Sequence, residues 1–180
     1  MNRSSIFAFG FSIFTLFHFA SAYADVNTTI RTPRRTVIPA ILRDFELSQR
    51  EIEASDNFTR RTYPLATLER SASRRYNCHS YAWYSQAAAN NIWLNDEDPY
   101  WTDGSYVLIQ QVNGGINLPA NVPNGSKLSW LWNDHSAIKV DAATVRSKWG
   151  PGPQMRHHPG DSPYSCKQCS FPLKAYRLSN

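Results

Sequence analysis

The chain has 180 residues, enough for one domain with a hydrophobic core, and 42% of them are hydrophobic. Its formal net charge of +5 at pH 7 is too small an excess for a dedicated nucleic-acid binder, so we expect no nucleic-acid partner. A moderately basic surface still favours an acidic partner.

The N-terminus has the pattern of a secretory signal peptide. A charged start at Arg3 precedes an apolar stretch rich in Phe, Ile and Leu, and Ala22 and Ala24 frame an A-x-A cleavage site. The apolar stretch is too short for a membrane anchor and is interrupted by polar residues. We therefore expect residues 1–24 to be removed after Ala24, which leaves a secreted or periplasmic chain of about 155 residues without stable membrane insertion.

Residues 25–75 are polar and rich in Arg, Thr and Ser, with three prolines as breaks. Within them the segment 41–55 predicts one amphipathic helix, with Ile41, Leu42 and Phe45 on its apolar side. The segment 25–75 is either a removable pro-region or an arm packed on the domain, and the sequence does not distinguish the two.

The composition changes at Tyr76, because all six tryptophans lie beyond it. We expect residues 76–180 to form the main domain. Asn77 is a good N-cap, the QAAA stretch has high helix propensity and two asparagines close the pattern, so residues 77–89 predict a helix. The acidic segment 95–105 is typical of a solvated turn.

Strand-like runs dominate the rest of the chain, separated by Gly, Pro, Asn and Asp clusters. They cover residues 105–112, 127–132, 135–140, 144–149 and 173–178. The short DAA connection between the third and fourth runs predicts a hairpin. Residues 149–164 contain too many prolines and glycines for regular structure and predict a long loop. A helix followed by a small antiparallel sheet indicates an α+β fold.

Three cysteines are present, and two of them form a C-x-x-C pair at Cys166 and Cys169. In an oxidising compartment we expect these two to form a disulfide, with a zinc site completed by His157 or His158, or two free thiols, as alternatives. The favoured assignment includes no metal and no other cofactor. Cys78 is then the odd cysteine, which indicates a reactive thiol, an intermolecular bridge or a small buried core residue.

A thiol becomes a nucleophile where its thiolate is stabilised and a base lies nearby. Cys78 falls in the first turn of the predicted helix, where unpaired N–H groups and the helix dipole favour a thiolate. His135 opens a strand-like run and is the candidate base. His79 is the weaker candidate, because neighbouring residues on a helix point about 100° apart. We expect His79 to pack under the helix or to hydrogen-bond to the sheet.

The order of these motifs resembles the papain-like cell-wall peptidases of the NlpC type and the related CHAP amidases. The resemblance covers residues 76–150 and is carried by the helix-start cysteine, by GSKLSW at 125–130 and by HSAI at 135–138. Together, NCHSYAW, YWTDGSY, HSAI and SKWG also resemble a group of small exported bacterial proteins of this superfamily. These families have Asp where this chain has Asn77 and Ser126.

The resemblance implies a papain-like fold in which an N-terminal helix carries the cysteine and packs on a small antiparallel β-sheet. It implies a secreted, monomeric cysteine amidase or peptidase that hydrolyses amide bonds in peptidoglycan stem peptides. Cys78 would attack the carbonyl and His135 would transfer the proton. By position Ser147 would orient the imidazole, with His157, Asp141 or a backbone carbonyl as alternatives. The substrate groove would be lined by Tyr76, Tyr81, Trp83 and Trp101.

The rival interpretation is a non-catalytic exported module that binds a glycan or a protein through its aromatic surface, with Cys78 buried as a structural residue. Clustered aromatic residues form a core more often than a groove. A third interpretation is an inhibitor of another cell-wall enzyme.

Overall fold

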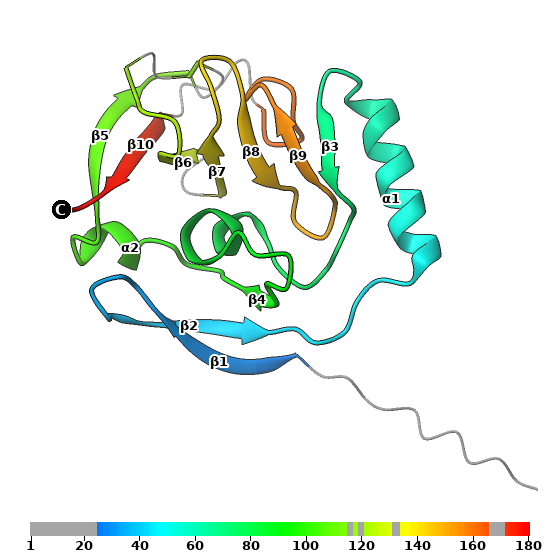
Figure 1. Ribbon diagram of the computed structural model, residues 1–180, viewed down its shortest axis with the longest axis horizontal. Helices are drawn as coiled ribbons and strands as arrows, with labels where there is room; N and C mark the ends of the chain where they lie inside the picture. Colours follow the sequence, from blue (N-terminus) through cyan, green and yellow to red (C-terminus); the bar gives the residue numbers. More distant parts are fainter. Residues whose placement is uncertain (1–24, 115–116, 119–120, 131–133, 166–171) are drawn as a thin grey trace, which may run out of the picture.

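Two antiparallel sheets form the framework of the protein (Figure 1). The structure is a computed structural model that describes residues 25–114, 117–118, 121–130, 134–165 and 172–180. Within this part of the chain, the small sheet has the strand order β1-β2-β4 and the large sheet the order β3-β9-β8-β7-β6-β10-β5. The coarse expectation of a mixed fold with antiparallel sheets is confirmed. The predicted signal peptide lies outside the described residues.

Ten strands and three helices make up the regular structure of the described residues. The small sheet contains β1 (Val26–Arg31), β2 (Val37–Leu42) and β4 (Ile92–Trp93). The large sheet contains β3 (Thr67–Arg70), β5 (Tyr106–Val112), β6 (Lys127–Trp130), β7 (His135–Lys139), β8 (Val145–Lys148), β9 (Gln154–His157) and β10 (Leu173–Leu178). The helices are α1 (Gln49–Thr62), the π-helix η1 (Ser80–Tyr84) and α2 (Pro99–Thr102).

The five predicted strands are confirmed as β5, β6, β7, β8 and β10, and the predicted hairpin is formed by β7 and β8. The hairpin turn is held by one side chain. The Asp141 carboxylate accepts hydrogen bonds from the backbone N–H groups of Ala143 and Thr144, at 2.9 and 2.8 Å, and from the Thr144 hydroxyl at 2.8 Å. This Asx-type turn fixes the register in which Ile138 pairs with Arg146.

The helix expected over residues 77–89 is much shorter in the structure. Helical backbone covers only residues 78–84, of which Ser80–Tyr84 form the π-helix η1. Asn77 does cap the turn, since its Oδ1 accepts from the Ser80 N–H at 3.1 Å. The Gln86 amide then donates to the Tyr81 carbonyl and the Asn90 amide to the Ser85 carbonyl. These side chains occupy carbonyls that a continuing helix would use, so the helix ends at Tyr84.

Two further expectations from the sequence are corrected. Residues 41 and 42 belong to β2, where Ile41 pairs with Trp93, and α1 begins only after the capping box formed by Ser48 and Glu51. The predicted loop 149–164 contains β9, which pairs with both β8 and β3. In each case the conformation is decided by pairing with a strand that is distant in the sequence, and the local residue pattern does not show this pairing.

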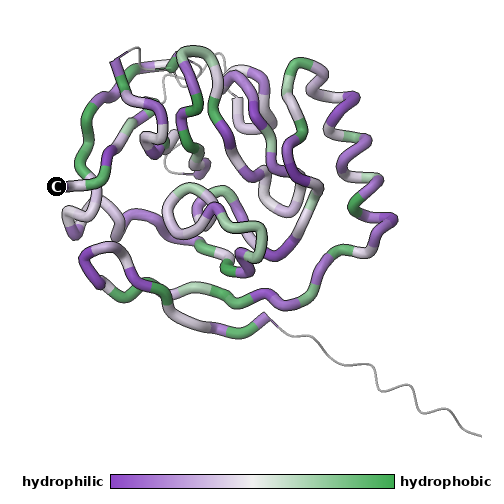
Figure 2. Tube along the Cα trace, viewed as in Figure 1, coloured by the Kyte–Doolittle hydropathy of each residue, from purple (hydrophilic) through white to green (hydrophobic). Residues whose placement is uncertain are grey.

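Residues 25–75 contribute to both sheets, with β1 and β2 in the small one and β3 at the edge of the large one. Their side chains also enter the core, because Ile30, Ile38 and Ala40 pack in one cluster with Trp83. The helix α1 lies at the outside of the molecule, and Figure 2 shows it as largely hydrophilic. No helix in the described ranges is long and apolar enough to cross a membrane.

Two apolar clusters cover opposite faces of the large sheet. One contains Trp83 and Tyr176 and lies on the side of η1 and the small sheet, and the other contains Leu128, Ala137 and Val145. Because side chains alternate along a strand, Ser136 and Ile138 of β7 face η1, while His135 and Ala137 lie on the other face. This alternation decides which of the candidate site residues can meet.

Candidate active site

Cys78 is almost enclosed, with 5% of its surface exposed, and it is a free thiol. It sits where the chain enters η1, which contacts β6, β7 and β8 of the large sheet. Cys166 and Cys169 lie outside the described residues, so the disulfide expected between them stays a prediction.

His79 is held between a carboxylate and the sheet. Its Nδ1 lies 2.9 Å from Ser136 Oγ and 3.1 Å from Glu97 Oε2, and all three side chains are buried. The Trp83 indole N–H donates to the same Ser136 oxygen at 2.9 Å. The expectation that His79 hydrogen-bonds to the sheet is confirmed. The Glu97 contact corrects the expectation of a solvated turn at this residue.

These neighbours determine the charge of His79. Burial alone lowers its pKa, but the interactions with Cys78, by charge and hydrogen bond, and with Glu97 outweigh burial and raise the pKa to about 10. His79 is therefore an imidazolium at neutral pH, placed between the thiol and a buried carboxylate.

Lys148 is a second buried cation near the thiol. Its Nζ donates to the backbone carbonyls of Ser73 at 2.7 Å, Gly150 at 2.6 Å and Gly152 at 2.5 Å. Burial lowers the Lys148 pKa to about 7, against the opposing effect of nearby negative charge that includes Cys78. The side chain thus ties β8 to the loop beyond it and adds positive potential beside Cys78.

His135, the base predicted from the sequence, is fully buried on the other face of the sheet. Its ring stacks on Tyr164, with centroids 3.7 Å apart, and meets Trp130 edge-on. Neither ring nitrogen has a hydrogen-bond partner among the described residues. Burial, followed by the positive potential of His157 and His79, holds the His135 pKa well below its usual value. His135 is neutral, and Tyr164, on which it stacks, interacts in turn with Cys78.

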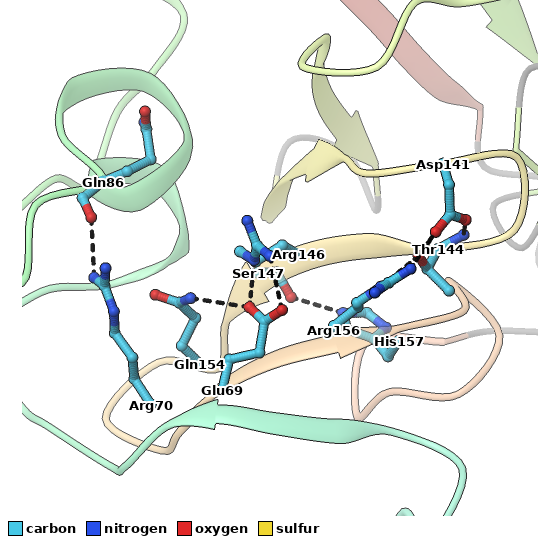
Figure 3. Close-up of polar contacts among 10 residues, drawn as sticks. All are labelled: Glu69, Arg70, Gln86, Asp141, Thr144, Arg146, Ser147, Gln154, Arg156 and His157. Carbon is cyan, nitrogen blue, oxygen red and sulfur yellow. Dashed lines mark hydrogen bonds and ion pairs between the residues drawn. The ribbon is translucent and has the colours of Figure 1, made fainter.

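Ser147 does not orient His135. Its hydroxyl lies 2.8 Å from Nε2 of His157 and accepts from the Trp149 indole N–H at 3.0 Å (Figure 3). Nδ1 of His157 lies 2.8 Å from the His158 carbonyl, so Nδ1 carries the proton and Nε2 accepts from Ser147. Burial lowers the His157 pKa to about 4. The expected His135–Ser147 hydrogen bond is absent from the structure.

The four aromatic residues expected in a substrate groove lie as two pairs, Tyr76 with Tyr81 and Trp83 with Trp101, whose ring centroids are 6.5 and 5.1 Å apart. Trp83 lies in the core, in contact with Tyr100, Trp101, Tyr106 and Tyr176. Tyr76 is buried with its ring 5.0 Å from Lys148 Nζ. Trp101 lines a cavity of about 500 Å³ beside β5 and β10. Tyr81 lines another cavity.

The cavity at Tyr81, which we name the β3–η1 cavity, has a volume of about 690 Å³. Its walls come from β3, η1, β7, β8 and β9, with Glu69, Arg70, Arg146 and Gln154 as its main polar groups. Glu69 forms a two-point ion pair with Arg146, whose Nη2 lies 2.7 Å from Glu69 Oε1 (Figure 3). The volume falls in the range typical of small-molecule sites.

Sequence patterns do not identify Glu97, Lys148 or the polar residues of this cavity as parts of a site. Glu97 stands in an acidic run that is typical of a turn, and Lys148 in a strand pattern, so neither carries a local signal of burial. Only the long-range packing of these side chains identifies them.

No group of three or more His, Cys, Asp or Glu side chains that could hold a metal ion occurs in the described ranges. Comparison of the chain with protein-family models, curated proteins and solved structures finds no match. The likeness to NlpC-type and CHAP enzymes therefore depends on the short sequence motifs alone.

Proposed function

We propose that the protein is a secreted cysteine hydrolase that cleaves amide bonds, with Cys78 as the nucleophile and peptidoglycan stem peptides as the substrate class. The observation that carries this proposal is the contact of Cys78 with a histidine whose pKa is raised to about 10. An imidazolium beside a thiol stabilises the thiolate, which is the reactive form. The motif likeness supplies the substrate class.

In this mechanism the Cys78 thiolate attacks the amide carbonyl carbon and forms a tetrahedral oxyanion. Backbone N–H groups near Cys78 stabilise the oxyanion. His79 donates its proton to the leaving amine as the C–N bond breaks, which leaves a thioester on Cys78. A water molecule, deprotonated by the now neutral His79, then attacks the thioester, and the acid product leaves with the thiolate and the imidazolium restored.

This assignment gives His79 the proton transfer that the sequence motif gives to His135. Glu97 supports the imidazolium form of His79, whereas the lowered pKa of His135 disfavours the imidazolium that would form if His135 took the thiol proton. The motif-based alternative, with His135 as the base and Ser147 behind it, needs His135 to reach the thiol from the other face of the sheet. The two histidines can be separated by experiment.

Mass spectrometry of peptidoglycan incubated with the mature protein tests the proposal. We expect new fragments with the wild type and none with Cys78→Ser, and the fragment masses identify the bond. His79→Gln should lower the initial rate by at least about a hundredfold, whereas His135→Gln, if it folds, should lower it far less. The reverse order would assign the base to His135. An absence of fragments from peptidoglycan and from a mixed peptide library would exclude the hydrolase.

One observation favours the rival function, a non-catalytic binding module. Only 5% of Cys78 is exposed, as expected of a structural core cysteine. Alkylation by iodoacetamide separates the two, because a nucleophile should be modified in the folded protein at pH 7 and more slowly in His79→Gln. A thiol that reacts only after urea is added would support the binding module.

A further inference from the structure

We propose that the β3–η1 cavity is a binding site for an N-acylated amino acid, such as the C-terminal residue of a peptide. Arg70 would hold the carboxylate, and Gln154 would accept the hydrogen bond of the adjacent amide N–H. The proposal concerns binding and stands whether or not Cys78 is a nucleophile.

A bulge in β3 directs two consecutive charged side chains to this cavity. Leu68 pairs with Met155 and Arg70 with Gln154, so Glu69 is the extra residue in the strand. In a regular strand Glu69 and Arg70 would point to opposite faces, whereas both of them line the cavity. Bulges commonly re-aim side chains at sheet edges and beside functional sites.

The charges of the cavity leave one cation for a ligand. Glu69 is engaged by Arg146 and also accepts from the Gln154 amide at 3.2 Å. Arg70 donates to the Gln86 carbonyl at 2.9 Å, and it has no carboxylate partner within the described part of the chain. A guanidinium has five N–H donors in a planar fork that suits a carboxylate. The lining residues therefore favour a ligand with one negative charge.

Gln154 adds a second, independent requirement. It is almost fully buried, and its Oε1 has no hydrogen-bond partner among the described residues. The contact of Nε2 with the Glu69 carboxylate fixes the orientation of this amide, because a carboxylate needs a donor. In Figure 3 the amide oxygen points away from Glu69, on the side of Arg70. The terminal torsion of glutamine is soft, so a modest rotation presents Oε1 to a donor in the cavity.

The spacing of these two groups selects the ligand. Arg70 and Gln154 are direct partners across β3 and β9, which places their Cβ atoms about 5 Å apart. A ligand that serves both must carry a carboxylate and an N–H donor close together. In an N-acylated amino acid the carboxylate and the amide N–H are both attached to the α-carbon. Tyr81 and Ile138 offer apolar surface for the side chain of such a ligand.

The same row of residues leads toward Cys78. Gln154 pairs with Arg70 on one side and with Lys148 of β8 on the other, and Lys148 interacts with Cys78. Adjacent strands are about 4.8 Å apart, so the backbones of Arg70 and Lys148 lie about 10 Å apart on the two sides of β9. If the proposed hydrolase function holds, the cavity would select substrates by a carboxylate on the side of the leaving amine.

Calorimetric titration of the Cys78→Ser protein, in which no probe can be hydrolysed, tests the binding site. The probes are N-acetyl-alanyl-alanine, its C-terminal amide, and the analogue whose second peptide nitrogen is methylated. We expect the free acid to bind at least about tenfold more tightly than the amide, and the N-methyl analogue to bind severalfold more weakly than the acid. N-acetyl-alanyl-glutamate amide distinguishes a side-chain carboxylate, which should bind more weakly than the C-terminal one.

Arg70→Gln and Arg60→Gln form a matched pair of variants, because both remove one positive charge and Arg60 lies on α1 away from the cavity. Arg70→Gln should abolish the preference for the acid over the amide, and Arg60→Gln should keep it. Equal binding of acid and amide, loss of the preference in both variants, or no binding up to roughly 20 mM would overturn the proposal. Acid-selective binding without peptidoglycan cleavage would retain this site and reject the hydrolase, and cleavage without selective binding would do the reverse.

Discussion

At the level of single residues, the main feature is that three buried histidines have different charges because their neighbours differ. His79 has a carboxylate and a thiol beside it, and its pKa rises to about 10. His157 donates to a backbone carbonyl, and burial lowers its pKa to about 4. His135 has no partner for either nitrogen among the described residues, and its pKa falls well below the usual value. Where different surroundings separate the pKa values of chemically identical side chains, the pKa values indicate which side chain acts as an acid and which as a base.

Glu97→Gln tests the origin of the His79 charge. The variant keeps the shape of the side chain but removes its charge, so we expect the His79 pKa to fall from about 10 toward 6.5. A pH titration of the His79 ring proton by NMR measures the shift directly, and Asp96→Gln, on the exposed neighbouring residue, is the control. An unchanged His79 pKa would contradict the role given to Glu97.

The same contact makes stability depend on pH with a definite sign. The folded pKa of His79 lies above its usual value of 6.5, so its contribution to the free energy of unfolding is complete below pH 6.5 and is lost as the pH rises through 10. In urea unfolding between pH 6.5 and 10, Glu97→Gln should show a smaller loss than the wild type. Parallel pH profiles for the two proteins would count against a charged His79.

Lys148 stabilises the loop that follows β8. Its ammonium group bonds three backbone carbonyls, those of Ser73, Gly150 and Gly152, and a methionine in its place leaves all three without this donor. We expect Lys148→Met to lower the free energy of unfolding by about 2 kcal/mol. Urea unfolding measures the change, with Lys174→Met, on a less buried lysine of β10, as the control. A neutral result would mean that the relief of burying a charge balances the lost hydrogen bonds.

At the level of elements, Asn77 connects η1 to β4 and thereby positions the turn that holds Cys78. Its Oδ1 accepts from the N–H groups of Ser80 and Leu94, and its Nδ2 donates to the Leu94 carbonyl at 2.6 Å. Asn77→Ala removes all three hydrogen bonds and should cost about 2–3 kcal/mol. Asn77→Asp keeps the acceptor and loses the donor, so its unfolding midpoint should lie between those of the wild type and Asn77→Ala. Equal midpoints for Ala and Asp would show that the acceptor contributes nothing.

The sequence predicts those elements whose information is local. Strand-like runs bounded by turn residues locate β5, β6, β7, β8 and β10, and the Asp141 turn between β7 and β8 has a sequence signature. The cap at Asn77 is also local. The π-helix is not predictable in this way, because it ends where Gln86 and Asn90 take its carbonyls. The strands β3 and β9 have no clear local signal, and their pairing with each other becomes visible only in the structure.

The candidate site divides in the same way. Cys78 stands out in the sequence as the odd cysteine, and the sheet contact of His79 follows from the angle between neighbours on a helix. The burial of Glu97 and the partner of Ser147 depend on which strands lie side by side, which the motif pattern does not contain. The alternation of β7 turns Ser136 toward η1 and His135 to the other face, so only the packing of the sheet shows which of these adjacent residues bonds to His79.

At the level of the whole molecule, the segment 25–75 packs against the rest of the fold and contributes strands to both sheets. Its strands β1 and β2 complete the small sheet, and Asp56 of α1 accepts a hydrogen bond from the Ala72 N–H at 2.8 Å. Strand β3 pairs along β9 and supplies the Glu69 partner of Arg146. Contacts of this kind are typical of an integral part of a domain. Removal of residues 25–75 would expose apolar surface on the remaining chain and would leave the edge of β9 unpaired.

We therefore predict that a chain beginning at Tyr76 does not fold. Without Ile30, Ile38 and Ala40 the cluster around Trp83 is open to water on one side, and β9 loses its outer partner. Urea titration followed by tryptophan fluorescence should give a cooperative transition for the chain that begins at Asp25 and a gradual, non-cooperative change for the one that begins at Tyr76. Cooperative unfolding of both chains at similar midpoints would instead identify residues 25–75 as a pro-region that maturation can remove, and the cavity at β3 would then exist only in the precursor.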